Sequence, residues 1–217
     1  MKTRIKICCI QSIDEARMAL EAGADALGLV SAMPSGPGPI DEDLIAEIAA
    51  TIPHRIWSVL LTSKLTAAEI IAQQRRTGVN TLQLVDAVPF AELTTLRNEL
   101  PRVRLMQVIH VLGEESLAEA LAYAPHVDAL LLDSGNPKLA VKELGGTGRI
   151  HNWNISRAIV ESVRVPVFLA GGLRAENIAG AIRTVQPYGV DVCSGVRIDG
   201  LLDKQKLAMF VRSVALS

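Results

Sequence analysis

The chain alternates short apolar runs with longer segments in which apolar residues recur every three or four positions. The first run spans 3–10, and the segment 12–23 follows it, with Ser12 and Glu15 in capping-box spacing and Gly23 as a stop signal. Short runs are typical of strands, and a repeat near 3.6 predicts an amphipathic helix. The N-terminus is therefore predicted to form a strand and then a helix.

This strand–helix pair recurs until eight strands are predicted. The remaining strands are expected at 26–31, 56–61, 81–85, 103–111, 128–133, 165–170 and 189–195. The remaining helices are expected at 41–52, 66–78, 89–99, 114–124, 153–162, 175–185 and 203–215. Apolar strands that alternate with amphipathic helices indicate a parallel sheet covered by helices, which places the chain in the α/β class.

Eight such units in 217 residues favour a closed (β/α)8 TIM barrel, with residues 1–217 forming a single domain. A doubly wound open sheet is the alternative. It would usually need fewer units, and no GxGxxG motif follows the first strand. A barrel also predicts where the chemistry takes place, because the active sites of this fold lie at the carboxyl ends of the strands.

Side-chain alternation sorts the first strand into two faces. Ile5 and Ile7 should pack against the helices, which turns Lys6 and Cys8 into the barrel, with Cys8 at its mouth. Cys9 is then expected to point outward to the helices. The two adjacent thiols are therefore predicted to have different surroundings, and only Cys8 is predicted to face the active site.

The same sorting applies to the sixth and eighth strands. It places Asp133 at the mouth of the barrel, and it puts Asp191 and Cys193 on one face of the eighth strand. The first and eighth strands are neighbours in a closed barrel, and a buried lysine is costly without a partner. The sequence therefore predicts that Lys6 and Asp191 form a buried ion pair.

The composition of the chain bears on which classes of partner are expected. Apolar residues make up 49% of the chain, and the formal net charge is −1, which gives no sign of a nucleic-acid or membrane surface. No apolar run approaches the ~20 residues that span a bilayer, and no signal peptide is recognisable. The three cysteines have no metal-ligand spacing, so free thiols, no metal and a cytoplasmic location are expected.

Three glycine-rich segments follow the last three predicted strands: GGTG at 145–148, AGGL at 170–173 and CSGV at 193–196. Glycine lets backbone N–H groups approach an anion closely, and the loops after strands seven and eight are the usual phosphate position in barrels. The predicted phosphate-binding residues are Gly146, Gly148, Gly171, Gly172, Ser194 and Gly195.

Several motifs together resemble the phosphoribosylanthranilate isomerase family over nearly the whole chain. They are KIC at 6–8, EAGADALGLV at 21–30, LQLV with Gln83, LLLD ending at Asp133, GGTG followed by Trp153, LAGGL with Glu176 and Asn177, and GVDVCSGV at 189–196. Barrels that share only a phosphate site would match the last two motifs, but not KIC, LLLD and GGTG as well.

The resemblance implies a TIM-barrel enzyme of tryptophan biosynthesis that converts an N-linked 5-phosphoribosyl aminoaldose into an open-chain aminoketose. Cys8 would be the general base at C2′, and Asp133 the general acid at the ring oxygen. Gln83 would contact the substrate, a small phosphorylated sugar derivative. The resemblance implies no metal or organic cofactor, and it leaves open a monomer or a homodimer.

The residues that differ from the family's motifs are mainly those expected to surround the aromatic acid of the substrate. The loop at 31–41 contains no Arg or Lys, although the family usually carries an Arg there that is associated with the anthranilate carboxylate. Cys9 stands where the family has Gly, and Asp86 adds a negative charge beside the expected pocket. His110 and Arg197 also replace family residues, and either one is expected to supply the missing carboxylate contact.

Two alternatives remain at the level of sequence. One is a paralogue that isomerises another phosphorylated amino sugar, and the other is a non-catalytic barrel that binds a sugar phosphate. The presence of both Cys8 and Asp133 argues against the second alternative.

Overall fold

Eight parallel strands pair in chain order and close on themselves, because β8 pairs with β1 as well as with β7. The computed structural model describes residues 2–217. Its barrel strands are β1 (Arg4–Ile7), β2 (Ala26–Val30), β3 (Trp57–Thr62), β4 (Thr81–Leu84), β5 (Arg104–His110), β6 (Ala129–Asp133), β7 (Val167–Leu169) and β8 (Gly189–Val192). The predicted TIM barrel is confirmed, and the open sheet is not formed.

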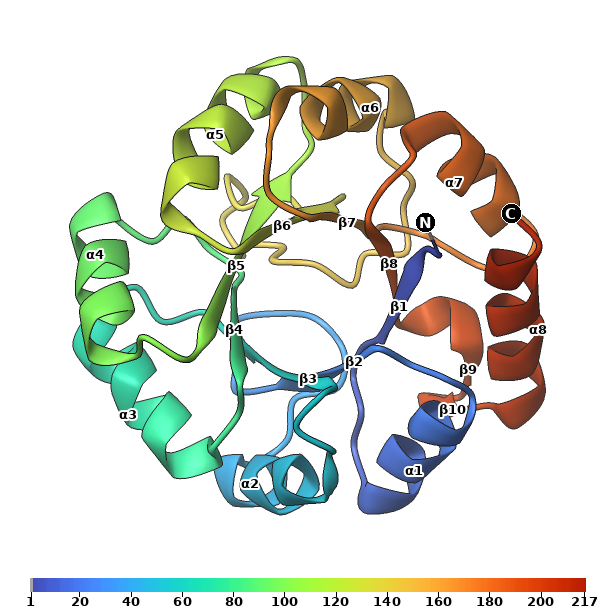
Figure 1. Cartoon of the computed structure of the whole chain (residues 1–217), viewed down its shortest axis with the longest axis horizontal. Coiled ribbons are helices and arrows are strands. Elements are labelled where there is room, and N and C mark those ends of the chain that lie inside the picture. The colour runs from blue at the N-terminus through green and yellow to red at the C-terminus, as the bar shows by residue number, and fades with distance from the viewer. Residues whose placement is uncertain (1) are drawn as a thin grey trace.

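Eight helices form a ring around the barrel (Figure 1). They are α1 (Ile13–Glu21), α2 (Glu42–Thr51), α3 (Ala67–Thr77), α4 (Phe90–Glu99), α5 (Glu115–Tyr123), α6 (Trp153–Ser162), α7 (Ile178–Val185) and α8 (Lys204–Ala215). The predicted start of α1 is confirmed, because Ser12 Oγ accepts a hydrogen bond from the Glu15 N–H at 3.1 Å. In a capping box the Glu15 carboxylate would accept a hydrogen bond from the Ser12 N–H. In the structure it accepts one from the Gln11 N–H instead.

The ends of the barrel strands differ most from the prediction. The first strand ends at Ile7 and the eighth at Val192, so Cys8 and Cys9 belong to a loop and Ser194–Val196 form a short 3-10 helix, η2. A small hairpin of β9 (Arg197–Ile198) and β10 (Leu201–Leu202) was not predicted at all. Its turn is Asp199-Gly200, with φ of 50° and 82°, and an Asp-Gly pair is a strong signal for such a turn.

Two apolar layers hold the barrel together. The outer layer lies between strands and helices and includes Ile5 and Ile7, as their alternation predicts. The inner layer fills the barrel with residues such as Val59, Met106 and Leu131. This division leaves few polar side chains inside, and each of them needs a partner there.

Lys6 is fully buried inside the barrel, and the predicted ion pair is confirmed. Lys6 lies opposite Asp191 in the register of β1 with β8, and its Nζ is 2.8 Å from Asp191 Oδ1. Burial lowers the pKa of Lys6, but the charges of Asp191 and Cys8 outweigh burial and raise the pKa overall. The lysine therefore carries its positive charge at the floor of the barrel mouth.

Replacing Lys6 with methionine should lower the free energy of unfolding by about 3–5 kcal/mol, because the Asp191 carboxylate then stays buried without its partner. Replacing Asp191 with leucine in the same chain should restore most of the loss, since no buried charge remains. Chemical denaturation followed by circular dichroism measures both changes. Equal stability of Lys6→Met and the wild type would contradict the role given to the pair.

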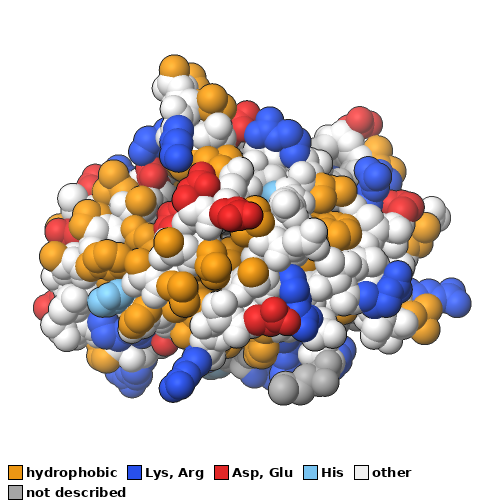
Figure 2. Space-filling model, turned by 90° about the horizontal axis from the view of Figure 1, so that it is seen from above, with side chains coloured by type: hydrophobic (Ala, Val, Ile, Leu, Met, Phe, Trp, Pro, Cys, Tyr) orange, Lys and Arg blue, Asp and Glu red, His pale blue; other side chains and the backbone are white. Residues whose placement is uncertain are grey.

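The helices and the charged surface residues can be compared with the composition of the chain. Among residues 2–217, every helix is too short or too polar to cross a membrane. Acidic and basic side chains are interspersed over the face shown in Figure 2, in keeping with the formal net charge of −1.

Candidate active site

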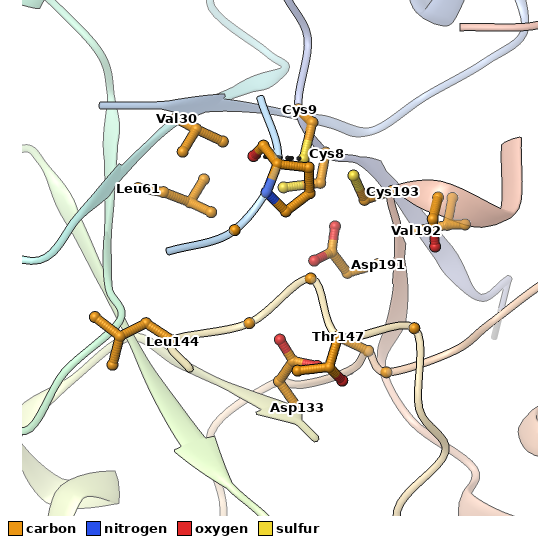
Figure 3. A pocket seen from close by; sticks show the side chains of 18 of the residues that line it. Cys8, Cys9, Val30, Leu61, Asp133, Leu144, Thr147, Asp191, Val192 and Cys193 are labelled. Carbon is orange, nitrogen blue, oxygen red and sulfur yellow. Dashed lines mark hydrogen bonds between the residues drawn. The ribbon is translucent and has the colours of Figure 1, made fainter. Parts of the chain in front are cut away.

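A cavity opens at the carboxyl ends of the strands, where the fold predicts the active site. Cys8 lies on one side of it and Asp133 on the other, and Asp191 lies between the two in the view of Figure 3. Glycines of the loops after β6 and β7 and Ser194 after β8 form part of the wall. The structure therefore brings together the predicted acid–base pair and most of the predicted phosphate-binding residues.

The Cys8 thiol is held tightly at the mouth of the barrel. The residue is 5% exposed, and its backbone N–H donates to the Val192 carbonyl at 2.8 Å. Gly28 on β2 faces it so closely that a Cβ there would lie 2.8 Å from Cys8 Sγ and 3.0 Å from Lys6 Nζ. A glycine is therefore needed at position 28 for the thiol and the ammonium group to share this space.

The Cys8 thiol also has surroundings that favour its ionised form. A hydrogen bond with the Cys9 thiol and the positive charge of Lys6 lower the pKa of Cys8, although burial acts in the opposite direction. The pKa of Cys9 is raised well above its ordinary value by hydrogen bonds with Cys193 and Cys8 and by burial. Cys8 is therefore the thiol that ionises first, which suits a general base.

The prediction that Cys9 faces the helices is wrong. Cys9 lines the cavity and packs in the inner apolar layer, and its thiol lies 3.6 Å from the Pro37 carbonyl oxygen. The reason is local: β1 ends at Ile7, and Cys9 takes a left-handed conformation with φ of 62°. Alternation applies only within a strand, so it fails at this position. Glycine is the residue that adopts this conformation at least cost.

Asp133 ends β6 with one carboxylate oxygen anchored and the other turned to the cavity. Oδ1 accepts a hydrogen bond from the Ser134 N–H at 2.7 Å. Oδ2 faces Gly145, where a Cβ would lie 2.7 Å from it. Gly145 has a φ of 132°, so the GGTG segment passes over Asp133 in a conformation open only to glycine. The carboxyl group is thus oriented, and one oxygen stays free for proton transfer.

The three glycine-rich loops pack directly on one another beside the acid–base pair. A Cβ on Gly172 would lie 2.8 Å from the Gly148 carbonyl oxygen, and one on Gly195 would lie 2.1 Å from the Leu173 carbonyl oxygen. Gly171 has a φ of 82°, and Gly148 and Gly172 also lie in the left-handed region. Within residues 2–217, the backbone N–H groups of Gly148, Gly171 and Gly172 donate no hydrogen bond to another backbone group.

The predicted phosphate-binding residues fall into two groups. Gly146, Gly148, Gly171, Gly172 and Ser194 line the cavity, and Gly195 lines a neighbouring hollow that shares Gly148, Gly172 and Ser194 with it. Backbone N–H groups without protein partners, in close-packed glycine loops, form the kind of concave surface that binds an anion. This end of the cavity suits a phosphate group.

The opposite end of the cavity is apolar. Val30, Leu61 and Leu144 lie together there (Figure 3), with Met33 packed against the same cluster. Gln83 also lines the cavity; it is 4% exposed, and its Oε1 has no hydrogen-bond partner. An acceptor that is buried without a partner favours a ligand that donates to it. The apolar wall suits an aromatic ring, and the sequence prediction did not find it because its residues come from three separate loops and strands.

His110 and Arg197, which were expected to contact the substrate, lie outside the cavity. His110 is turned sideways, with Nε2 2.9 Å from the Val85 carbonyl oxygen. Arg197 is buried against Glu15, with Nη1 2.9 Å from Glu15 Oε1. Asp86 is likewise absent from the lining, because its carboxylate is bound to Lys142. The structure therefore assigns neither His110 nor Arg197 to the carboxylate of a ligand, and it holds the negative charge of Asp86 outside the cavity.

Within residues 2–217, no three His, Cys, Asp or Glu side chains are arranged to hold a metal ion.

Replacing Gly28 with alanine should lower kcat at least about tenfold, because the new Cβ displaces the Cys8 thiol from its place. Gly180→Ala is the matched control, since a Cβ at that position in α7 meets no atom within 4 Å. The control should retain full activity and gain slightly in stability, as alanine favours a helix. Steady-state kinetics on both variants tests the expectation, and full activity of Gly28→Ala would refute it.

Comparison with known proteins links this geometry to one family. The family model for N-(5′-phosphoribosyl)anthranilate (PRA) isomerase matches residues 5–213. N-(5′-phosphoribosyl)anthranilate isomerase 2 of Methanosarcina mazei is 39% identical over 210 residues, which cover 96% of this chain and 92% of that protein. The isomerase of Haloarcula marismortui is 36% identical over 213 residues, which cover 97% of this chain and 95% of that protein.

Solved structures agree with this result. The phosphoribosyl anthranilate isomerase of Thermotoga maritima matches with a TM-score of 0.84 at 27% identity, and the match covers 98% of both chains. A crystal structure of such an isomerase in complex with reduced 1-(o-carboxyphenylamino)-1-deoxyribulose 5-phosphate matches with a TM-score of 0.81 at 25% identity, again over 98% of both chains. By its sequence and its fold together, the chain belongs to the phosphoribosylanthranilate isomerase family.

Proposed function

We propose that this protein isomerises N-(5′-phosphoribosyl)anthranilate to the aminoketose 1-(o-carboxyphenylamino)-1-deoxyribulose 5-phosphate, a step of tryptophan biosynthesis. One observation carries the proposal: in a chain of this family, Cys8 and Asp133 face each other across a cavity with a glycine-rich end and an apolar end. A phosphorylated sugar joined to an aromatic amine has the same two ends, with the reacting carbons between them.

The glycine-rich end would hold the phosphate through backbone N–H groups of Gly148, Gly171 and Gly172, with Ser194 beside them. The apolar wall around Val30 would receive the aromatic ring. This placement leaves the ribose in the middle of the cavity, between the Cys8 thiol and the Asp133 carboxyl group. Holding the reacting carbons there supplies the orientation on which the rate depends.

The two side chains are proposed to carry the first two proton transfers at the sugar. Asp133 donates a proton to the ring oxygen as the C1′–O bond breaks, which opens the furanose and leaves a protonated imine at C1′. The Cys8 thiolate then removes the proton from C2′, and the electron pair moves to the nitrogen to give an enolamine. In the tautomerisation that follows, C1′ gains a proton and the 2′-hydroxyl group loses one, which gives the ketone at C2′. Acid–base catalysis by the two side chains accounts for ring opening and for removal of the C2′ proton.

Turnover of the named substrate tests the proposal directly. The purified protein is mixed with N-(5′-phosphoribosyl)anthranilate, and loss of the substrate's fluorescence is followed. We expect kcat/KM within the range of about 10⁴–10⁸ M⁻¹s⁻¹ that is usual for enzymes. Turnover of a different phosphorylated amino sugar in its place would support a paralogue, and binding without any turnover would support a non-catalytic barrel.

The location and assembly of the enzyme are part of the same proposal. We place it in the cytoplasm, where its three free cysteines stay reduced. We expect it to act as a monomer or a homodimer, because every residue proposed for the reaction lies on one chain. Light scattering at the concentration of the kinetic assay decides between the two.

A further inference from the structure

Arg197 has a different role from the one that its sequence position suggested. It begins β9, directly after the loop that follows β8, and it is only 7% exposed. Its guanidinium group points to the segment that follows β1 and away from the cavity. Nη2 donates to the Cys8 carbonyl oxygen at 3.2 Å and also to the Cys9 carbonyl oxygen. The two peptides beside the proposed catalytic thiol are therefore held by one nitrogen.

Glu15 fixes the guanidinium group from the other side. The pair is bidentate, with Nη1 2.9 Å from Oε1 and Nη2 3.0 Å from Oε2. The same carboxylate accepts from the Gln11 N–H at 3.0 Å and from the Leu202 N–H at 2.8 Å. Bidentate arginine–carboxylate pairs are geometrically specific. Glu15 thus joins the loop after β1, the start of α1 and the β9–β10 hairpin at a single point.

The contacts of Arg197 explain why the chain turns at Cys9. In an extended strand, successive carbonyl groups point in opposite directions, and one nitrogen cannot reach both. The left-handed conformation of Cys9, with φ of 62°, turns the carbonyl groups of Cys8 and Cys9 to the same side. A residue other than glycine adopts this conformation only when its surroundings impose it. Arg197 supplies that constraint, and the turn in its turn places the Cys9 thiol beside Cys8.

We propose that Arg197, held by Glu15, is a positioning residue that fixes the orientation of the Cys8 thiol and keeps the Cys9 thiol next to it. Arg197 does not line the cavity, so it acts through the backbone of Cys8 and Cys9 and not by touching the substrate. The kinetic part of this proposal rests on the proposed isomerase function. The reactivity of the Cys8 thiol does not depend on any substrate, so it can be measured independently.

Three variants separate positioning from general stability. Arg197→Gln removes the contacts to both carbonyl groups, Arg197→Lys keeps the charge but cannot bond Glu15 in two places, and Glu15→Gln loosens the guanidinium group. Arg4→Gln is the matched control, because it breaks an ion pair of β1 with Asp25 at the opposite end of the same strand. The midpoint temperature of thermal unfolding is measured for each variant together with its activity.

Two readouts are compared for every variant. The first is kcat and KM with N-(5′-phosphoribosyl)anthranilate. The second is the rate at which iodoacetamide alkylates Cys8 as a function of pH, with the modified residue located by mass spectrometry. The other ionisable groups around the thiol stay the same in all variants; they are Lys6, Cys9, Asp133, Asp191 and Cys193. Arg197→Gln and Glu15→Gln each also remove a charge, and the charge of Arg197 interacts with Cys9 and Cys193. Arg197→Lys keeps the positive charge, so a shift of its alkylation midpoint reports a change of geometry.

For Arg197→Gln we expect kcat to fall about 10–100-fold with KM changed less than about threefold, because the thiol is misplaced while the binding surfaces remain. The alkylation midpoint should move toward that of an ordinary thiol, since the Cys9 thiol no longer stays beside Cys8. Arg197→Lys should recover part of both losses, Glu15→Gln should show smaller shifts in the same direction, and Arg4→Gln should match the wild type.

A folded Arg197→Gln variant with wild-type kcat and a wild-type alkylation profile would overturn the proposal. Losses in Arg4→Gln equal to those in Arg197→Gln would also overturn it, since they would reflect stability alone. If Arg197→Gln does not fold, Arg197→Lys and Glu15→Gln decide the matter by the same two readouts. If the wild type does not turn over the substrate, the proposed function fails, but the alkylation profiles still test the positioning role.

Discussion

Replacing Cys8 with serine is expected to lower kcat by about 10²–10⁴-fold, the contribution that a positioned general base usually makes. Serine keeps nearly the same size, so the substrate should still bind and KM should change little. A serine hydroxyl does not ionise near neutral pH, whereas Lys6 and Cys9 favour the thiolate of Cys8. Steady-state kinetics with N-(5′-phosphoribosyl)anthranilate measures the loss.

The pH dependence of the wild type gives an independent check on the same thiol. A general base must be deprotonated, so kcat/KM should rise with pH and level off once Cys8 is ionised. Because the pKa of Cys8 is lowered, the midpoint of this rise should lie below the ~8.5 of a free thiol. The serine variant should lack the rise altogether.

Cys193→Ser provides the comparison for Cys8→Ser. Cys193 also borders the cavity, and its replacement makes the same chemical change without altering Cys8. We expect its kcat to fall no more than about tenfold, since no proton transfer passes through it. Equal losses in the two variants, or a pH profile that survives in Cys8→Ser, would show that Cys8 is not the base.

The barrel and the side chains in its interior could be predicted from the sequence because they follow from the regular spacing of apolar residues in strands and helices. The alternation of side chains within β1 correctly predicted that Lys6 points into the barrel. The closure of the barrel by β8 and β1 correctly predicted that Lys6 lies opposite Asp191. The placement of Asp133 followed in the same way from the end of β6. In each case a local rule and a regular sheet were sufficient, because the side chains in question lie within or at the end of a strand.

The residues that could not be predicted lie beyond the strand ends, where no period applies. Cys9 differs from its predicted place because it lies beyond the end of β1 and has a left-handed φ, with its carbonyl group bound by Arg197, which is far away in the sequence. Arg197 in turn was expected at the substrate because the loop at 31–41 lacks the arginine that the family resemblance implies, whereas its partner in the structure is Glu15. A side chain that satisfies one local rule can still have its main partner elsewhere, and only the folded chain shows which contact it makes.

Replacing Asp133 with asparagine should lower kcat by about 10²–10⁴-fold, because an amide has the same shape as the carboxyl group but cannot donate a proton to the ring oxygen. The amide oxygen can still accept from the Ser134 N–H, so the orientation of the side chain should persist. Binding of reduced 1-(o-carboxyphenylamino)-1-deoxyribulose 5-phosphate, measured by calorimetry, should therefore stay close to that of the wild type. A large loss of kcat with intact binding is the signature of a missing acid.

Asp86→Asn is the matched control for Asp133→Asn. It makes the same change at the same end of the barrel, but the Asp86 carboxylate is engaged by Lys142 and lies outside the cavity. Its kcat should stay within about threefold of the wild type, as expected for a partly exposed ion pair away from the reaction. If Asp133→Asn kept a wild-type kcat, or if it lost binding and kcat to the same extent, the acid would have to be sought elsewhere. Asp191 would be the remaining carboxyl group in the cavity; burial raises its pKa, but its side chain is engaged by the buried Lys6.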